Sequence, residues 1–340
     1  MSSEPTAGPV LVLSWFHQQQ TRSGAGRVGD PLWDALDEAL SIGRARPYTR
    51  GLNTVLSLLQ VRQLVLEQRD AFFRLQPQMN GRWGTFHDAL DGGALVFRSD
   101  RRLNTDGPAM PALDMLAQIV TERRPRLVIS VGLGGGVRPE HQVGDVVVTS
   151  RARFDLTGEL DSYEDNERTF SADGPVPEDW LADLRFDELR EPALLGSSPA
   201  FRPPAAGWPQ PPAHRPVIRV DREHPVWTRP ALDANTFNPA PTRSSPRNPY
   251  LGDVAAAVDM DAAAAAKACQ DANVPFAAVL GLVVPALEVM EDDWDRSLRD
   301  AWAEVFTGEY SVAAATNAAA VVRRICEQLV DVVNPAGRRG

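Results

Sequence analysis

Two stretches of this sequence decide its fold: Pro125–Ser150, PRLVISVGLGGGVRPEHQVGDVVVTS, and Ala257–Pro285, AVDMDAAAAAKACQDANVPFAAVLGLVVP. In the first stretch, Leu127–Val131 is a short apolar run, which is typical of a parallel strand covered on both faces. The glycine-rich residues 132–136 follow and predict a turn, and Gly144–Val148 predicts a second strand. The first stretch therefore predicts a strand, a glycine turn and another strand, in that order.

The second stretch predicts an alanine-dense helix over Asp259–Asn273 and a buried strand over Phe276–Val284. Elsewhere in the chain, apolar runs predict strands at 10–13 and 94–97, and helical spacing predicts helices at 31–40, 52–75, 111–123 and 311–330. Helices that alternate with buried strands indicate an α/β protein. We expect a single domain over residues 1–340, with a twisted, mixed, mostly parallel sheet and helices on both faces.

Two segments have the character of insertions into this domain. Residues 31–80 predict a helical insertion. Residues 197–250 are rich in Pro, Arg and Asn, and the fixed φ angles of repeated prolines oppose regular helices and central strands. Inside this segment only 216–221 and 226–227 are strand-like. We expect the remainder to be a surface excursion, either partly disordered or a lid over the site.

Composition restricts the class of ligand. The formal net charge of −10 argues against a broad nucleic-acid-binding face. Two cysteines are too few for a disulfide framework or a zinc site, and the five histidines lack metal-binding spacing. No apolar stretch approaches the ~20 residues that span a bilayer, and the N-terminus lacks the basic region of a signal peptide. We expect a cytoplasmic protein without a metal or other cofactor, which binds a small polar ligand and neither nucleic acid nor membrane.

Taken together, the two stretches resemble the purine nucleoside phosphorylase and nucleosidase superfamily, as a divergent member. The resemblance is carried by the strand and glycines of 127–136, by Val-Gly-Asp-Val-Val-Val at 143–148, and by the pair Met260-Asp261 before the strand Phe276–Val284. It implies the twisted α/β fold, a purine nucleoside or nucleotide as ligand, and a homo-oligomer. Phosphate would be the co-substrate if the reaction were phosphorolysis.

The resemblance also implies a set of ligand-binding residues. They are Met260, Asp261, Gly132, Leu133, Gly134, Gly135 and Val284. Met260 would pack on the sugar, and Asp261, in place of the usual Glu, would bind the ribose hydroxyls. Leu133 stands where the family often has a small hydroxyl residue or alanine, which favours a nucleosidase or a binder over a phosphorylase. The alternative for Asp261 is structural, because acidic side chains are favoured in the first turn of any helix.

Val284 stands where family members carry the catalytic Asp that protonates the purine. A valine has no proton to give, and loss of a general acid typically lowers the rate by a factor of ~10² to 10⁴. Acidic residues shortly after this strand could supply the proton instead: Glu288, Glu291, Asp292 and Asp293. The sequence therefore assigns no catalytic residue.

Two hypotheses for the function follow from these residues. The first is recognition of a purine nucleoside or nucleotide, with cleavage of the N-glycosidic bond by hydrolysis or phosphorolysis if another acid serves. The alternative is a catalytically inactive nucleotide sensor or an oligomeric scaffold in a bacterial signalling or defence system. An acidic group over the base would favour the enzyme, and an apolar base pocket lined by Leu280, Leu282 and Val284 would favour the sensor.

Overall fold

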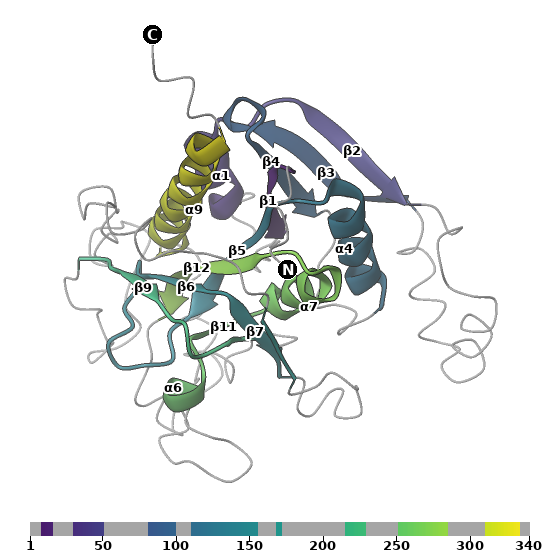
Figure 1. Cartoon of the computed structure of the whole chain (residues 1–340). Coiled ribbons are helices and arrows are strands. Elements are labelled where there is room, and N and C mark those ends of the chain that lie inside the picture. The colour runs from purple at the N-terminus through teal and green to yellow at the C-terminus, as the bar shows by residue number, and fades with distance from the viewer. Residues whose placement is uncertain are drawn as a thin grey trace, which may run out of the picture.

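The strands of the chain form one large sheet. The computed structural model describes residues 8–15, 30–50, 81–99, 110–155, 168–171, 215–228, 251–284 and 310–333. The described strands are β1 (Val10–Trp15), β2 (Ala45–Arg50), β3 (Gly81–Ala89), β4 (Ala94–Ser99), β5 (Leu127–Gly135), β6 (Val146–Thr149), β7 (Arg151–Phe154), β8 (Thr169–Ser171), β9 (Ile218–Val220), β10 (Val226–Thr228), β11 (Ala257–Asp259) and β12 (Phe276–Val284). They form a 12-stranded sheet in the order β2-β3-β4-β1-β5-β11-β10-β7-β8, with β12 beside β5 and β6, and β9 beside β6 (Figure 1).

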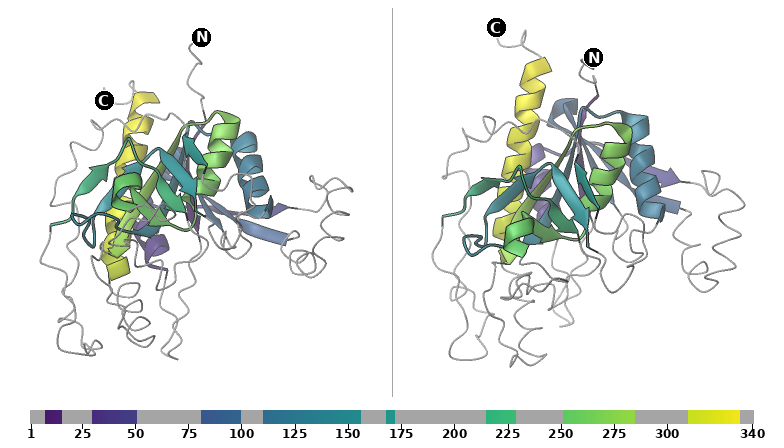
Figure 2. Two further views of the ribbon diagram at one scale, coloured as in Figure 1. Left: turned by 90° about the horizontal axis from the view of Figure 1, so that it is seen from below. Right: turned by 60° about the horizontal axis from the view of Figure 1, so that its bottom comes forward.

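Helices cover both faces of this sheet. The described helices are α1 (Pro31–Leu40), α4 (Met110–Arg123), α6 (Leu251–Val254), α7 (Ala262–Ala272) and α9 (Ser311–Val333), with a 3₁₀ turn η1 (Leu90–Gly92). The pair α1 and α9 packs on one face, and the pair α4 and α7 packs on the other (Figure 1, Figure 2). The expected α/β fold with helices on both faces is confirmed.

No helix in the described ranges is both long enough and apolar enough to cross a lipid bilayer.

The sheet is mixed, and its parallel share is smaller than expected. Six of the described strand pairs are parallel and five are antiparallel. The parallel pairs include the central strands β4, β1, β5 and β12. The antiparallel pair β2 and β3 extends one edge, and β8 pairs antiparallel with β7 at the other. These edge strands have no strong apolar run, so the sequence pattern did not predict them.

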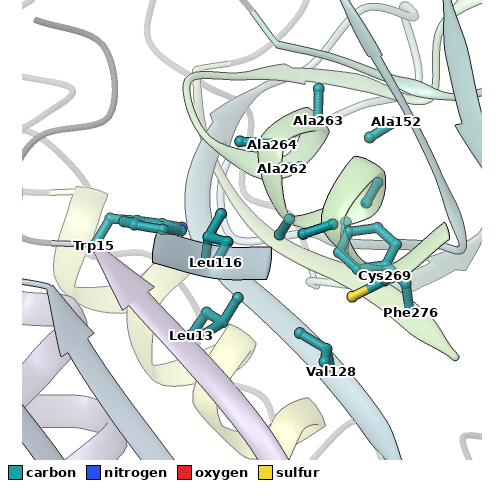
Figure 3. Close-up of a cluster of buried hydrophobic side chains, with 14 of the residues drawn as sticks. Leu13, Trp15, Leu116, Val128, Ala152, Ala262, Ala263, Ala264, Cys269 and Phe276 are labelled. Carbon is teal, nitrogen blue, oxygen red and sulfur yellow. The ribbon is translucent and has the colours of Figure 1, made fainter. Parts of the chain in front are cut away.

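Small side chains build the core between α7 and the sheet. Ala262–Ala266 are all buried, and their short side chains let the helix lie close to the strands beneath it. Figure 3 shows alanines and Cys269 of α7 together with Phe276 of β12 and Val128 of β5. The alanine-dense run in the sequence is therefore a packing surface, and it fixes the position of the N-terminus of α7.

The glycines after Leu127–Val131 do not form the predicted turn. Strand β5 continues through Gly135, and Gly132 and Gly134 lie opposite Leu280 and Leu282 in a parallel pair with β12. Continuation is possible because β12 supplies hydrogen-bond partners along this whole length. The turn prediction was wrong because a glycine-rich composition also suits a strand that another backbone approaches closely.

The two predicted insertions are only partly described. In 31–80, α1 has the predicted bounds, but Ala45–Arg50 forms the edge strand β2, so this segment is not wholly helical. Residues 51–80, with the predicted helix at 52–75, lie outside the described residues. In 197–250, the strand-like residues form β9 and β10, which join the sheet. Residues 197–214 and 229–250 lie outside the described residues, so the lid stays a prediction.

Gly281 gives a direct test of the packing of α9 on β12. A methyl group at Gly281 would overlap the backbone carbonyl of Ala314 in α9. Because the obstructing atoms belong to the helix backbone, they cannot move aside as the end of a flexible side chain could. We expect Gly281→Ala to lower the free energy of unfolding by about 1–3 kcal/mol or more. The measurement is chemical denaturation followed by circular dichroism.

Gly43→Ala is the matched control for this test. The nearest atom to its new methyl group would be the carbonyl oxygen of Asp88 at 3.4 Å, which is ordinary contact. We expect a change within about 0.5 kcal/mol. Equal unfolding midpoints for the two variants would contradict the packing described here.

Candidate functional site

The ends of three strands and the start of one helix converge at one place in the sheet. Strand β12 ends at Val284, which lies opposite Gly135, the last residue of β5. Strand β11 crosses at the same point, because Val258 pairs antiparallel with Gly135. Met260 and Asp261 follow β11 directly and lead into α7. The structure thus brings the predicted site segments together at the carboxyl ends of β5 and β12, where ligands commonly bind in open α/β sheets.

The glycines of β5 make room for neighbouring chain segments. A methyl group on Gly134 would lie 2.7 Å from the carbonyl oxygen of Val258, and one on Gly135 would lie 2.9 Å from the Val258 side chain. A methyl group on Gly132 would lie 3.2 Å from Leu280. The glycines therefore permit the close crossing of β11 over β5. Because glycine has no side chain, only the backbone atoms of these residues can contact a ligand.

Leu133 has a different environment from the glycines around it. Its side chain is half-buried and packs against the apolar cluster between the sheet and the helices α1 and α9. That cluster includes Val131 and Val279 of the central strands. The side chain of residue 133 is thus used for packing, and it offers no hydroxyl to an anion.

Asp259 is held by hydrogen bonds from three sides. The Thr228 hydroxyl donates to Oδ1 at 2.5 Å, and the Ala262 backbone N–H donates to Oδ2 at 2.8 Å. The backbone N–H of Asp261 is a further donor to this carboxylate. Burial raises the pKa of Asp259 to about 6, although these hydrogen bonds oppose the rise. Asp259 is therefore a buried carboxylate at the N-terminus of α7, a position that the helix dipole favours.

Asp261 plays a different part from Asp259. The helix α7 begins at Ala262, later than predicted, because residues 257–259 belong to β11. Asp261 is the residue that precedes this helix, but its side chain makes no capping hydrogen bond. The structural role at the start of the helix that was considered for Asp261 is thus carried out by Asp259. Burial, together with the charge of Asp259, raises the pKa of Asp261 well above its usual range.

The remaining predicted ligand-binding residues lie at the same junction. Met260 is half-buried between the two acids. Val284 is placed by its backbone at the end of β12 after an irregularity in the pairing with β5. The acids considered as replacements for the missing catalytic Asp, Glu288, Glu291, Asp292 and Asp293, lie outside the described residues. Within the described ranges, no three His, Cys, Asp or Glu side chains gather closely enough to hold a metal ion.

The Gly-Asp motif before β6 braces the end of β12. Asp145 is fully buried, and its carboxylate accepts the Val217 backbone N–H at 2.9 Å and Arg219 Nε at 3.0 Å. The backbone carbonyl of Asp145 accepts the N–H of Leu282, and the N–H of Gly144 donates to the carbonyl of Leu282. This motif is therefore structural, and it ties the carboxyl end of β12 to β9.

Arg138 holds the loop that follows β5, and sequence reasoning did not single it out. Its guanidinium donates to the backbone carbonyl of Gly252 at 2.9 Å and to Asp221 Oδ2 at 2.7 Å, and it lies 2.9 Å from His224 Nδ1. Burial tends to raise the pKa of Asp221, but hydrogen bonds from His224, Arg138 and Glu223, together with the charge of Arg138, outweigh it and lower the pKa. The loop after β5 is thereby anchored to the turn before β10 and to α6.

The comparison with protein families identifies the class of this chain. The phosphorylase superfamily matches residues 101–327, which is more than half of the chain. The chain therefore belongs to the phosphorylase superfamily, and the predicted resemblance to nucleoside phosphorylases and nucleosidases is confirmed. A search of curated proteins gave no significant match.

A comparison with solved structures matched this chain to several nucleosidases. One is a Helicobacter pylori MTAN mutant with 5′-methylthioadenosine in the active site, with 9% identity and a TM-score of 0.51 over 94% of this chain and 99% of that chain. Another is 5′-methylthioadenosine/S-adenosylhomocysteine nucleosidase from Neisseria meningitidis in complex with methylthio-immucillin-A, with 15% identity and a TM-score of 0.49 over 94% of this chain and 99% of that chain. The Helicobacter pylori structure supports the fold of this chain.

The buried acid at 259 gives a prediction about stability and pH. Its pKa of about 6 in the folded protein lies above the value of about 3.9 expected in an unfolded chain. The stability that this carboxyl contributes is full below about pH 4 and is lost as the pH rises through about 6. The relevant quantity is the free energy of unfolding of the wild type minus that of Asp259→Asn. We expect this difference to fall by about 2–3 kcal/mol between pH 4 and pH 7.

Urea denaturation at several pH values measures this difference. Asp253→Asn is the control, because Asp253 is exposed on α6, and we expect its difference from the wild type to stay flat. A difference for Asp259→Asn that rises with pH would contradict the raised pKa.

Proposed function

We propose that this protein binds a purine nucleoside at the junction of β5, β11, β12 and α7. The observation that carries the proposal is the carboxyl group of Asp261. It is buried at this junction and is not used to cap α7, which Asp259 does instead. In the proposed complex the Asp261 carboxyl group engages both ribose hydroxyls, and Met260 packs on the sugar. Family membership and the nucleoside ligand of the Helicobacter pylori neighbour support the same class of ligand.

We propose cleavage of the N-glycosidic bond as the reaction. The bond between the ribose anomeric carbon and the purine nitrogen breaks, its electron pair stays with the base, and a nucleophile bonds to the anomeric carbon. The base needs a proton as it leaves. Position 284 supplies none, so we propose that the proton comes from one of the two described acids at the junction, Asp259 or Asp261, whose pKa values are raised by burial.

Water is the nucleophile that this proposal favours. A phosphorylase must bind an anion next to the anomeric carbon, and small hydroxyl residues suit that task. Leu133 instead places an apolar side chain in the cluster beneath α1 and α9. Hydrolysis is therefore the favoured reaction, and no cofactor is required for it.

We also propose that the protein forms a homo-oligomer. This proposal rests on the family resemblance alone.

Asp261→Ala tests the binding site. The substitution removes the carboxyl group and with it the proposed hydrogen bonds to the ribose hydroxyls. We expect the Kd for the nucleoside to rise about 10- to 100-fold, as for loss of a hydrogen bond to a charged or strongly polar group. Isothermal titration calorimetry with adenosine, inosine, guanosine, methylthioadenosine and adenosylhomocysteine gives the Kd. Asp253→Ala, on the exposed surface of α6, is the control and should bind as the wild type does.

Release of free base from the same nucleosides, followed by chromatography, tests the reaction. We expect release without phosphate and no release from Asp261→Ala. Release that depends on phosphate would identify a phosphorylase instead. Tight binding without release would favour the nucleotide sensor. Absence of binding to every nucleoside would overturn the proposed function.

A further inference from the structure

We propose that His141 is a positioning residue of the nucleoside site, whose neutral imidazole holds the backbone of Val137 and thereby the strand β11 that leads to Met260 and Asp261. The proposal rests on the proposed function for its ligand. The contacts of His141 themselves can be measured without any ligand. His141 belongs to the loop that connects the end of β5 with the start of β6.

His141 closes this loop at two points. Its imidazole Nδ1 accepts the backbone N–H of Val137 at 3.1 Å, and its own backbone N–H donates to the carbonyl of Arg138 at 2.9 Å. The residue is 1% exposed, so water competes little for either bond. Because a backbone N–H can only donate, Nδ1 is without a proton, and the neutral imidazole carries its proton on Nε2.

The loop that His141 closes is attached to the segment that enters β11. The Arg138 guanidinium donates to the backbone carbonyl of Gly252 at 2.9 Å and to that of Ala255 at 3.2 Å. Both carbonyls lie shortly before β11 in the chain. Because the carbonyl of Arg138 accepts from His141, the turn around His141 and the approach to β11 are held as one unit.

Val137 connects the same loop to β11 itself. Its side chain is fully buried and belongs to the apolar cluster that contains Val258. Val258 is the residue of β11 that pairs with Gly135 where the two strands cross. Asp261 follows shortly after β11. A change in the backbone at Val137 would therefore displace the residues against which the proposed ribose site is built.

The surroundings of His141 keep its imidazole neutral. Burial, followed by the positive charges of Arg219 and Arg138, lowers the pKa of His141 to about 4, although the charges of Glu140 and Asp145 oppose this change. Among the described residues, these four are the charged groups that act on the imidazole. Protonation would put a hydrogen on Nδ1, against the backbone N–H that Nδ1 now accepts. The neutral form is thus the form that closes the loop.

The tautomer of His141 is the first measurement, and it needs neither a ligand nor a stable variant. We expect ¹⁵N NMR of the wild-type imidazole at pH 7 to show an unprotonated Nδ1 and a protonated Nε2. We expect no titration between pH 7 and pH 5. A proton on Nδ1, or a titration midpoint near the ordinary histidine value of about 6.5, would overturn the inference.

Two substitutions separate the acceptor from the bulk of the side chain. His141→Leu leaves the Val137 N–H buried without a partner, whereas the amide oxygen of His141→Asn can take the place of Nδ1. We expect the hydrogen-exchange protection of the Val137 amide to fall about 10- to 100-fold in His141→Leu and to recover in His141→Asn. Equal protection in the wild type and His141→Leu would overturn the inference.

His87→Leu is the matched control for these variants. His87 lies on β3, and the strands β4 and β1 separate β3 from β5. We expect His87→Leu to leave the protection of the Val137 amide and the nucleoside affinity as they are in the wild type.

The dependence of stability on pH gives a readout that a loss of packing alone would not change. A histidine with a pKa of about 4 in the folded protein and about 6.5 in the unfolded chain binds more protons when unfolded. Its contribution is therefore full above about pH 6.5 and is lost as the pH falls toward 4. We expect the urea midpoint of the wild type, relative to that of His141→Asn, to fall between pH 7 and pH 5. A difference that stays flat would overturn the neutral imidazole.

Nucleoside affinity connects His141 to the proposed function. At pH 7 we expect His141→Leu to raise the Kd for the nucleoside that the wild type binds best by about tenfold, and His141→Asn to restore it. Isothermal titration calorimetry gives both values. If His141→Leu does not fold, His141→Gln takes its place, because the longer side chain carries its amide beyond the position of Nδ1.

The outcomes separate this inference from the proposed function. A wild type that binds a nucleoside and a His141→Leu variant that binds it equally well would overturn the inference and leave the proposed function standing. A wild type that binds no nucleoside would overturn the proposed function and the positioning role with it, while the tautomer and the Val137 protection would still show whether His141 closes the loop.

Discussion

The close crossing of β11 over the end of β5 is the constraint on which the site depends. The backbone of Val258 occupies the space that a side chain at Gly134 would fill, and the Val258 side chain covers Gly135. Because β11 lies there, Asp259, Met260 and Asp261 follow at the end of β12 and begin α7 beside the sheet. A larger residue at 134 or 135 would push β11 away, and with it the two acids.

Hydrogen bonds from segments that are distant in sequence hold this crossing in position. Asp145 ties the end of β12 to Arg219 and β9, while Arg138 ties the loop after β5 to Asp221 and α6. Thr228 then joins β10 to Asp259 and to the first turn of α7. Each bond is made by a side chain with at most modest exposure, where hydrogen bonds compete little with water. The result is a frame of hydrogen bonds around two buried carboxyl groups.

Much of the fold could be predicted from local pattern. Apolar runs predicted the buried strands at Val10–Leu13 and Phe276–Val284, and helical spacing predicted the helix at Pro31–Leu40. A strand buried on both faces, or a helix buried along one stripe, leaves a strong hydrophobic pattern in the sequence. The edge strands β2 and β3 leave a weak signal. The glycines at 132–136 were misread because glycine marks both turns and close backbone contacts.

By itself, the sequence determined the family, the α/β class and the pair Met260-Asp261, because these depend on residues that are adjacent or regularly spaced along the chain. Only the tertiary structure decided that Asp259 and not Asp261 caps α7, and that Thr228 contacts both Asp259 and the first turn of this helix. The contacts of Thr228 are hydrogen bonds between residues 31 and 35 positions apart. Burial, which raises the pKa values of both acids, is likewise a property of the packed molecule and not of the local sequence.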